Sequence, residues 1–182
     1  IDILINNAGV YGPKKQSTSE MDFAGFADTI NINTLGPLRV TQALLPNLRA
    51  PPKPKIVVIS SKMGSFGIRA TGAVAYRASK AAVNAFTESL ALELRAFNIR
   101  VGLILPGRAP QTRFGENARR TMGQLPESYA ALGQQIFDSM QDNASVTQTT
   151  DVAQAVWRMV HDPDAPLRLP AGEDALAMAQ DS

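Results

Sequence analysis

Three segments of the chain are apolar runs that lack the alternation of apolar and polar residues typical of a half-exposed strand. They are "IDILI" at residues 1–5, "KIVVIS" at 55–60 and "IRVGLIL" at 99–105. Short runs rich in isoleucine and valine predict strands of a parallel sheet that helices cover on both faces. A shorter run, "LRL" at 167–169, lies between two prolines and predicts a fourth strand.

Helical patterns separate these strands. The spacing of apolar residues predicts helices over 20–30, 33–48, 74–97 and 151–160. The segment "APPKP" at 50–54 ends the second of them, because proline has no N–H group to donate within a helix. Strands that alternate with helices form βαβ units, so the pattern predicts an α/β fold with a doubly wound parallel sheet.

The segment 108–149 differs from the rest of the chain. It is long, polar and dotted with methionine, and it lies between the third strand and the last helix. Such an insert is either a lid over a site or a helical excursion. Its apolar side chains indicate an apolar lining or the core face of a helix; they are Phe114, Met122, Leu125, Tyr129, Phe137 and Met140. At 182 residues, the chain 1–182 is predicted to form one domain.

Composition excludes several classes of function. The chain has 18 basic and 16 acidic residues and its longest basic runs are two residues, which is not the footprint of a nucleic-acid-binding protein. Cysteine is absent, which excludes disulfides and thiolate metal sites and fits a reducing compartment. The single histidine, His161, lies in a turn-like segment, and no metal site is predicted. No apolar run reaches the length of a membrane span, so we expect a cytoplasmic protein without a membrane partner.

Small or hydrogen-bonding residues follow each of the first three predicted strands. "NNAG" occupies 6–9, "SSKMGS" occupies 60–65, and "PG" occupies 106–107. In open parallel sheets, ligands bind beyond the carboxyl ends of the strands, and small residues there let a ligand approach the backbone. The recurrence of this feature at three strand ends predicts one ligand site that all three border.

A tyrosine and a lysine lie four positions apart in "YRASK", Tyr76 and Lys80, and one helical turn places them on the same face. A phenol has a pKa of about 10. A unit positive charge at about 4 Å, with an effective dielectric constant near 20, favours the phenolate by about 4 kcal/mol. The pair therefore predicts a phenol that exchanges protons with a substrate oxygen held by a nearby serine. The alternative is a surface pair worth a few tenths of a kcal/mol. Tyr11 and Lys15 share the spacing, but a glycine and a proline between them break any helix.

The five motifs "NNAG", "NINTLGP", "ISSKMGS", "YRASK" and "LPG", in this order and at these separations, resemble the classical short-chain dehydrogenase/reductase family over nearly the whole chain. "YRASKAAVN" after "SSKMGS" is most similar to the carbonyl-reductase and C-factor-like branch. The resemblance implies a Rossmann-type sheet and an oxidoreductase that transfers a hydride between a nicotinamide cofactor and a small-molecule carbonyl/alcohol substrate. It implies NAD or NADP, with a slight preference for NADP, and a homo-oligomer. No side chain carries a hydride by itself, so the chemistry needs such a cofactor.

The resemblance also implies a role for individual residues. Tyr76 would be the general acid/base, Lys80 would lower its pKa and bind the nicotinamide ribose, and Ser61 would orient the substrate oxygen. Asn33 would hold a water that connects Lys80 to solvent. The positions implied along the cofactor are Asn6, Ala8, Gly9, Tyr76, Lys80, Pro106, Gly107 and Ala109.

Some of these assignments have close competitors in the sequence. Ser60 and Ser65 compete with Ser61 for the substrate oxygen, and Asn31 competes with Asn33. Family members usually place a threonine five residues after the proline of "PG" against the cofactor. Here that position is Gln111 and Thr112 follows it, so neither is included in the predicted site.

The glycine-rich turn TGxxxGxG, which binds the pyrophosphate in the family, is not found in the chain. In the family "NNAG" follows the fourth strand. The resemblance therefore predicts a C-terminal portion of the domain that lacks the first three strands, about 75–90 residues if a βαβ unit needs about 30. The strand 1–5 would then be an exposed edge. Two alternatives stay open: a non-catalytic dinucleotide-binding or sensor protein, and an inactive truncated fragment.

Overall fold

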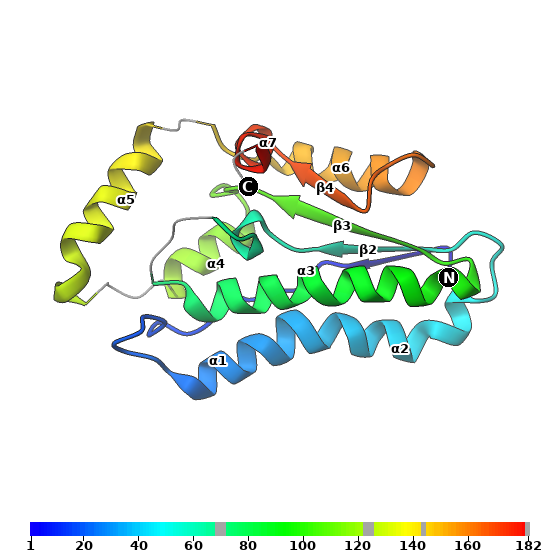
Figure 1. Ribbon diagram of the computed structural model, residues 1–182, viewed down its shortest axis with the longest axis horizontal. Coiled ribbons are helices and arrows are strands. Elements are labelled where there is room, and N and C mark those ends of the chain that lie inside the picture. The colour runs from blue at the N-terminus through cyan, green and yellow to red at the C-terminus, as the bar shows by residue number, and fades with distance from the viewer. Residues whose placement is uncertain (68–71, 122–125, 143–144, 181–182) are drawn as a thin grey trace.

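A computed structural model describes residues 1–67, 72–121, 126–142 and 145–180 of the chain. Its centre is a four-stranded sheet of β1 (Ile3–Asn6), β2 (Lys55–Ile59), β3 (Arg100–Pro106) and β4 (Arg168–Ala171). The strands lie in chain order and every neighbouring pair is parallel (Figure 1). This confirms the predicted α/β fold with its four strands, each within two residues of the predicted bounds.

Helices cover the two faces of the sheet (Figure 1). On one face, α2 (Gly36–Leu48) and α3 (Val74–Leu94) pack side by side, and their leucines and valines form a core with β2 and β3. On the other face, α6 (Thr149–His161) packs on β2, β3 and β4 through Ala155, Met159 and Val160. Both cores are made of the continuous apolar runs, as expected for strands buried on both sides.

The helix preceding β2 has an irregular centre. It begins with α1 (Phe23–Ile30), continues through a π-helical turn, η1 (Asn31–Leu35), and ends as α2. Asp22 caps its start by accepting a hydrogen bond from the Gly25 N–H at 2.9 Å. The sequence predicted two helices here with a break at 31–32. In the structure the two are continuous, because the π-helical turn joins them.

The segment between β3 and α6 is largely helical. It contains α4 (Arg113–Thr121), a 3₁₀ turn, η4 (Glu127–Tyr129), and α5 (Ala130–Asp142), which stands away from the sheet in Figure 1. Met122 and Leu125 lie outside the described residues, as do the side chains of Phe137 and Met140. The last helix, α7 (Glu173–Gln180), follows β4 and was not predicted.

The predicted helix 74–97 ends earlier as an α-helix. After α3, residues 95–97 form a 3₁₀ turn, η3 (Arg95–Phe97), and Asn98 follows with a left-handed backbone, φ 56°. The Asn98 side chain donates a hydrogen bond to the Pro52 carbonyl at 2.6 Å, which fixes the start of β3 beside the start of β2.

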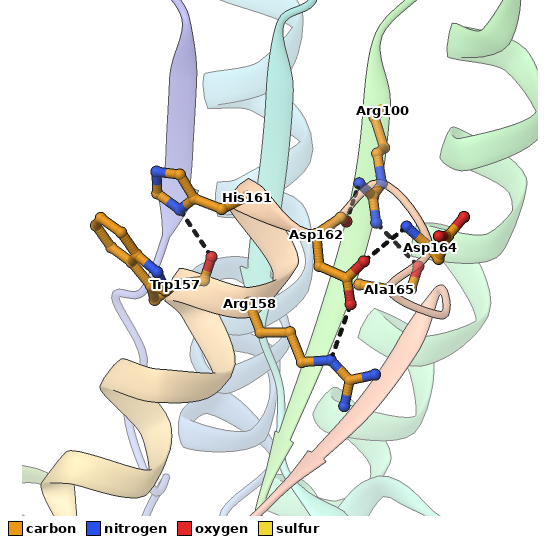
Figure 2. Close-up of polar contacts among 7 residues, drawn as sticks. All are labelled: Arg100, Trp157, Arg158, His161, Asp162, Asp164 and Ala165. Carbon is orange, nitrogen blue, oxygen red and sulfur yellow. Dashed lines mark hydrogen bonds and ion pairs between the residues drawn. The ribbon is translucent and has the colours of Figure 1, made fainter.

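The turn from α6 into β4 is tied to the start of β3 (Figure 2). The Arg100 guanidinium donates to the carbonyls of Asp162 and Ala165 at 2.6 and 2.9 Å. His161 is the last residue of α6; its ring stacks on Trp157 at 3.7 Å and its Nδ1 lies 2.9 Å from the Trp157 carbonyl oxygen. Both rings are exposed, at the amino-terminal end of β3. His161 is therefore remote from the opposite edge of the sheet, where ligands are expected.

Among the described residues, no helix is both long and apolar enough to cross a membrane.

Candidate active site

The predicted motifs converge at the carboxyl-terminal edge of the sheet. "NNAG" follows β1, "SSKMGS" follows β2 and forms the 3₁₀ turn η2 (Lys62–Gly64), and "YRASK" opens α3. Gly64 lets η2 pack directly on α3, because a Cβ there would lie 2.6 Å from the Lys80 carbonyl carbon. The close approach of these two elements brings Ser61, Tyr76 and Lys80 together.

Tyr76 lies in the first turn of α3, with its ring packed against two other aromatic rings. Only 5% of the residue is exposed. The Tyr11 ring stacks on it with centroids 5.1 Å apart, and the Phe114 ring of α4 lies 5.7 Å away. Burial raises the pKa of the Tyr76 phenol to about 12, a side-chain hydrogen bond with Ser61 opposes the rise, and Tyr11 adds to it. In this environment Tyr76 carries its proton at neutral pH.

Lys80 lies one helical turn further along α3 and is also buried, with 4% of its surface exposed. Its Nζ donates to the Ile59 carbonyl at the end of β2, at 3.2 Å, and lies 6.0 Å from the centre of the Tyr76 ring. Burial lowers the pKa of Lys80 to about 8. The ammonium is therefore close to losing its proton at neutral pH.

The expected lowering of the Tyr76 pKa by Lys80 is not what the structure gives. The sequence argument gave the effect of a full positive charge at about 4 Å before desolvation opposes it. In the structure, burial is the largest effect on both groups: it raises the pKa of the phenol and lowers that of the ammonium. Desolvation penalises the charged form of each group, so both are driven toward neutrality.

The geometry separates the three serines that compete for one role. Ser60 donates to Asn84 Oδ1 at 2.6 Å, which turns its hydroxyl toward the body of α3. The Ser61 hydroxyl accepts from the Met63 N–H at 3.1 Å and forms the hydrogen bond with Tyr76. Ser65 ends η2, and its carbonyl accepts from Arg77 at 3.3 Å. Of the three, Ser61 is thus the one whose side chain meets the phenol.

Asn33 is buried in the π-helical turn and holds the loop after β1. Its side chain makes two 2.8 Å hydrogen bonds with the backbone of Val10, one accepted from N–H and one donated to the carbonyl. Its Nδ2 also donates to Ser79 Oγ at 2.9 Å, and that hydroxyl donates to the Tyr76 carbonyl at 2.7 Å. Asn31, by contrast, is exposed and accepts from Arg39 at 2.6 Å. The buried network therefore includes Asn33 and excludes its competitor.

Gly9 explains how these groups come close to the first strand end. A Cβ at this position would lie 3.3 Å from Asn33 Oδ1 and 3.5 Å from Lys80 Nζ. The glycine leaves that narrow space open between the loop, the π-helical turn and α3. Asn6, at the end of β1, is buried and donates to Thr41 Oγ1 at 3.4 Å, whereas Ala8 is exposed.

The other predicted cofactor positions, Pro106, Gly107 and Ala109, lie after β3 and are partly exposed. The Gly107 N–H donates to Thr147 Oγ1 at 3.0 Å, and Thr147 donates to Asp174 Oδ1 at 2.7 Å. Thr147 and Asp174 are both buried and neither was predicted. They come from the segment before α6 and the first turn of α7, and no sequence motif links either residue to "LPG".

Thr112 has a structural role in this loop. Its hydroxyl donates to the Ala109 carbonyl at 2.8 Å and accepts from the Gly115 N–H at 3.0 Å. These bonds make it the residue that begins α4, a position that favours threonine. Gln111 is exposed.

A cavity of about 320 Å³ lies beside the aromatic rings. Residues of the loop after β1, of α1 and of α4 form its walls. Tyr11 and Phe114, the two rings that contact Tyr76, both line it, together with Val10, Pro13 and Ala118. The described residues contain no group of three or more histidine, aspartate or glutamate side chains placed to hold a metal ion.

A model of the short chain dehydrogenase family matches residues 1–123 of the chain, about two thirds of its length. The chain belongs to the short-chain dehydrogenase family. The match includes all five motifs, from "NNAG" through "LPG".

Two curated proteins illustrate how similar the chain is to its relatives. C-signal of Myxococcus xanthus is 44% identical over 108 residues, which are 59% of this chain and 64% of that protein. Retinol dehydrogenase 8 of Homo sapiens is 30% identical over 182 residues, 92% of this chain and 55% of that protein. The chain thus spans between about half and two thirds of the length of these relatives.

Solved structures of several dehydrogenases have the same fold. One from Streptomyces avermitilis superposes with a TM-score of 0.82 at 29% identity, covering 100% of this chain and 64% of that one. NAD⁺-bound xylitol dehydrogenase gives 0.73 at 26% identity, covering 94% and 68%. A Shigella flexneri short chain dehydrogenase complexed with NADP gives 0.58 at 32% identity, covering 66% and 48%.

Proposed function

We propose that the protein is an oxidoreductase that transfers a hydride between NAD or NADP and a carbonyl/alcohol pair. The observation that supports this best is the buried cluster in which the Tyr76 phenol is hydrogen-bonded to Ser61, one helical turn from Lys80. Family membership and the nicotinamide-bound relatives support the cofactor class, and one of them holds NAD⁺ while another holds NADP.

The residues at the strand ends fit a dinucleotide. Gly9, Gly107 and Ala109 offer little side-chain bulk beyond the sheet, and Lys80 places a donor next to Gly9, as its Nζ would lie 3.5 Å from a Cβ there. When bound, the nicotinamide supplies or takes up the hydride. The remaining steps are proton transfers and orientation, which this chain's own residues perform.

In the reduction direction, Tyr76 donates its proton to the carbonyl oxygen of the substrate as that oxygen becomes an alkoxide. A pKa of about 12 keeps the phenol protonated over the physiological range, so it is ready to donate. Ser61, already hydrogen-bonded to the phenol, orients the substrate oxygen toward it. Lys80, with a pKa of about 8, can return a proton to the tyrosine near neutral pH.

The cavity beside Tyr11 and Phe114 gives the substrate a mainly apolar environment. Since both rings contact Tyr76, a substrate that reaches the phenol from this cavity passes along aromatic surfaces. The proposed substrate is therefore an apolar aldehyde or ketone, or the corresponding alcohol.

Tyr76→Phe tests this function in the full-length protein. The change keeps the ring packing on Tyr11 and removes the ionisable group, so kcat is expected to fall by about 10²–10⁴-fold. Turnover is measured by oxidation of NADH or NADPH with a panel of aldehydes and ketones, and cofactor binding by fluorescence. Tyr129→Phe, in the 3₁₀ turn η4, is the matched control and should retain parental activity. Unchanged turnover in Tyr76→Phe would exclude Tyr76 as the proton donor. Absence of turnover in both the parent and the variant, with cofactor still bound, would favour a non-catalytic dinucleotide-binding protein.

A further inference from the structure

Gln16 is a buried polar residue that belongs to none of the sequence motifs. It lies in the loop between β1 and α1, and only 2% of it is exposed. Its backbone carbonyl accepts from the Val74 N–H at 3.2 Å, and its side-chain Oε1 accepts from the Tyr76 N–H at 3.1 Å. Its Nε2 donates to the Tyr11 carbonyl at 3.1 Å. One residue thus binds the start of α3 twice and the loop after β1 once.

The start of α3 needs these partners. The first N–H groups of a helix have no acceptor within the helix, and an N-cap side chain normally accepts from the second or third of them. The N-cap of α3 is Ala73, whose methyl group cannot accept a hydrogen bond. Gln16 supplies the missing acceptors. Its side chain accepts from Tyr76, which is the third residue of α3 and lies 60 positions further along the chain.

The same amide group also holds the residue whose ring stacks on the phenol. Tyr11, whose carbonyl accepts from Gln16, stacks its ring on Tyr76 with planes 25° apart. Gly12 makes room for this arrangement: its φ is 105°, and a Cβ there would lie 3.2 Å from Gln16 Nε2 and 2.9 Å from Thr29 Oγ1. The backbone of Tyr76 and one face of its ring are therefore fixed through one side chain.

We propose that Gln16 is a positioning residue, which sets the place of Tyr76 relative to Ser61 and Lys80 and holds Tyr11 against the phenol. The inference rests on the proposed function of Tyr76 as proton donor. Displacement of a reacting group by about 1 Å costs on the order of 10²-fold in rate, so a residue that fixes a donor's backbone affects kcat.

The role requires a side chain with one donor and one acceptor in a buried place, as in a neutral amide. An ionised glutamate at this position would keep the acceptor for Tyr76 but lose the donor for Tyr11. A protonated glutamate would restore both. Methionine has a similar length but offers no donor and only a weak acceptor. Gln16→Glu is therefore a conservative variant that acidification repairs, and Gln16→Met is the variant that nothing repairs.

The experiment compares Gln16→Met, Gln16→Glu and the parent in the full-length protein, with Gln42→Met, an exposed glutamine of α2, as matched control. For Gln16→Met we expect kcat for carbonyl reduction to fall about tenfold or more while KM for the cofactor stays within about twofold. For Gln16→Glu, we expect the ratio of its kcat to that of the parent to rise about fivefold or more between about pH 8 and pH 5. Ultraviolet titration of tyrosinate, with Tyr76→Phe identifying the Tyr76 component, should show a shifted pKa for Tyr76 in Gln16→Met.

A folded Gln16→Met with parental kcat and an unshifted Tyr76 titration overturns the proposal. So does a Gln16→Glu that loses activity to the same extent at every pH, because that result indicates loss of fold stability alone. If Gln16→Met does not fold, the pH series of Gln16→Glu decides. If the parent shows no turnover that depends on Tyr76, the proposed function fails, and the tyrosinate titration still tests whether Gln16 positions the phenol.

Discussion

At the scale of single residues, burial acts in opposite directions on the two titratable groups of α3. It raises the pKa of the Tyr76 phenol to about 12 and lowers the pKa of the Lys80 ammonium to about 8. The phenol therefore holds its proton more tightly than the ammonium does. In the proposed reaction, Lys80 is therefore the group that would return a proton to Tyr76.

The Lys80 ammonium should also destabilise the fold below its pKa. The folded-state pKa of about 8 lies below the usual 10.5, so the unfolded chain binds more protons between these values. The free energy of unfolding should therefore rise with pH across that window, and the full cost of about 3 kcal/mol applies below about pH 8. We expect Lys80→Met to be more stable than the parent by about 1–3 kcal/mol at about pH 7, with the gain disappearing by about pH 10.5.

Denaturant unfolding at several pH values measures this difference. Lys53→Met, at an exposed site before β2, is the control and should show no such pH dependence. Tyr76 acts at higher pH: because its folded-state pKa is raised, its contribution to stability is lost as pH rises from about 10 to about 12. A stability gain in Lys80→Met that is equal at every pH would contradict the assigned cause.

At the scale of elements, the site depends on how closely α3 approaches its neighbours. The π-helical turn η1 directs Asn33 and Thr34 toward α3, where Thr34 donates to the Ser79 carbonyl at 3.0 Å and Asn33 donates to the Ser79 hydroxyl. Such turns widen a helix by one residue and are common at functional sites. On its other side, α3 meets η2 at Gly64. The helix that carries Tyr76 and Lys80 is thus held between two irregular elements.

Gly64→Ala should disturb the second of these contacts. The new Cβ would lie 2.6 Å from the carbonyl carbon and 2.8 Å from the carbonyl oxygen of Lys80, and backbone atoms cannot turn aside. We expect a loss of about 1–3 kcal/mol in the free energy of unfolding and a displaced Ser61, and hence lower kcat. Gly36→Ala is the control, because its Cβ meets only open space and one backbone oxygen at 3.7 Å. An unaltered melting temperature in Gly64→Ala would show that η2 can move away without cost.

At the scale of the whole molecule, the two faces of the sheet are covered unequally. Leu4 of β1 packs on the core formed with α2 and α3. Ile3 and Ile5 face the other side, where α6 packs on β2, β3 and β4, and they are 42% and 46% exposed. In the described part of the chain, β1 pairs with β2 alone, so its outer edge also has free backbone groups. An exposed apolar edge strand is a site of self-association.

The chain of 182 residues, expressed alone, should therefore associate through this edge. Ile3→Lys places a charge on the uncovered face of β1 and should shift the sedimentation profile toward smaller species. Phe66→Lys, at a loop residue that is 90% exposed, is the control for the general effect of an added charge. Equal association of all three proteins would show that β1 is not the surface involved. The homo-oligomer of the full-length protein stays a separate prediction.

The sequence by itself determined the parts of this protein that depend on local pattern. The apolar runs specified the parallel strands. Burial on both faces favours such runs in β2 and β3, and β1 has the same apolar pattern although one of its faces is exposed. The motif order placed Ser61, Tyr76, Lys80 and Asn33 at one edge of the sheet. Their roles stay predictions, but the structure buries all four residues at this edge of the sheet.

Only the tertiary structure decided which neighbours these residues have. Burial sets the pKa values of Tyr76 and Lys80, and burial depends on distant segments such as Tyr11 and Phe114. Gln16 was missed because a lone glutamine in a loop has no local signature, and its function depends on bonds to residues about 60 positions away. The helices α4 and α5 were left undecided for a related reason: their segment is polar, and its apolar residues do not show whether it packs on a core or covers a site.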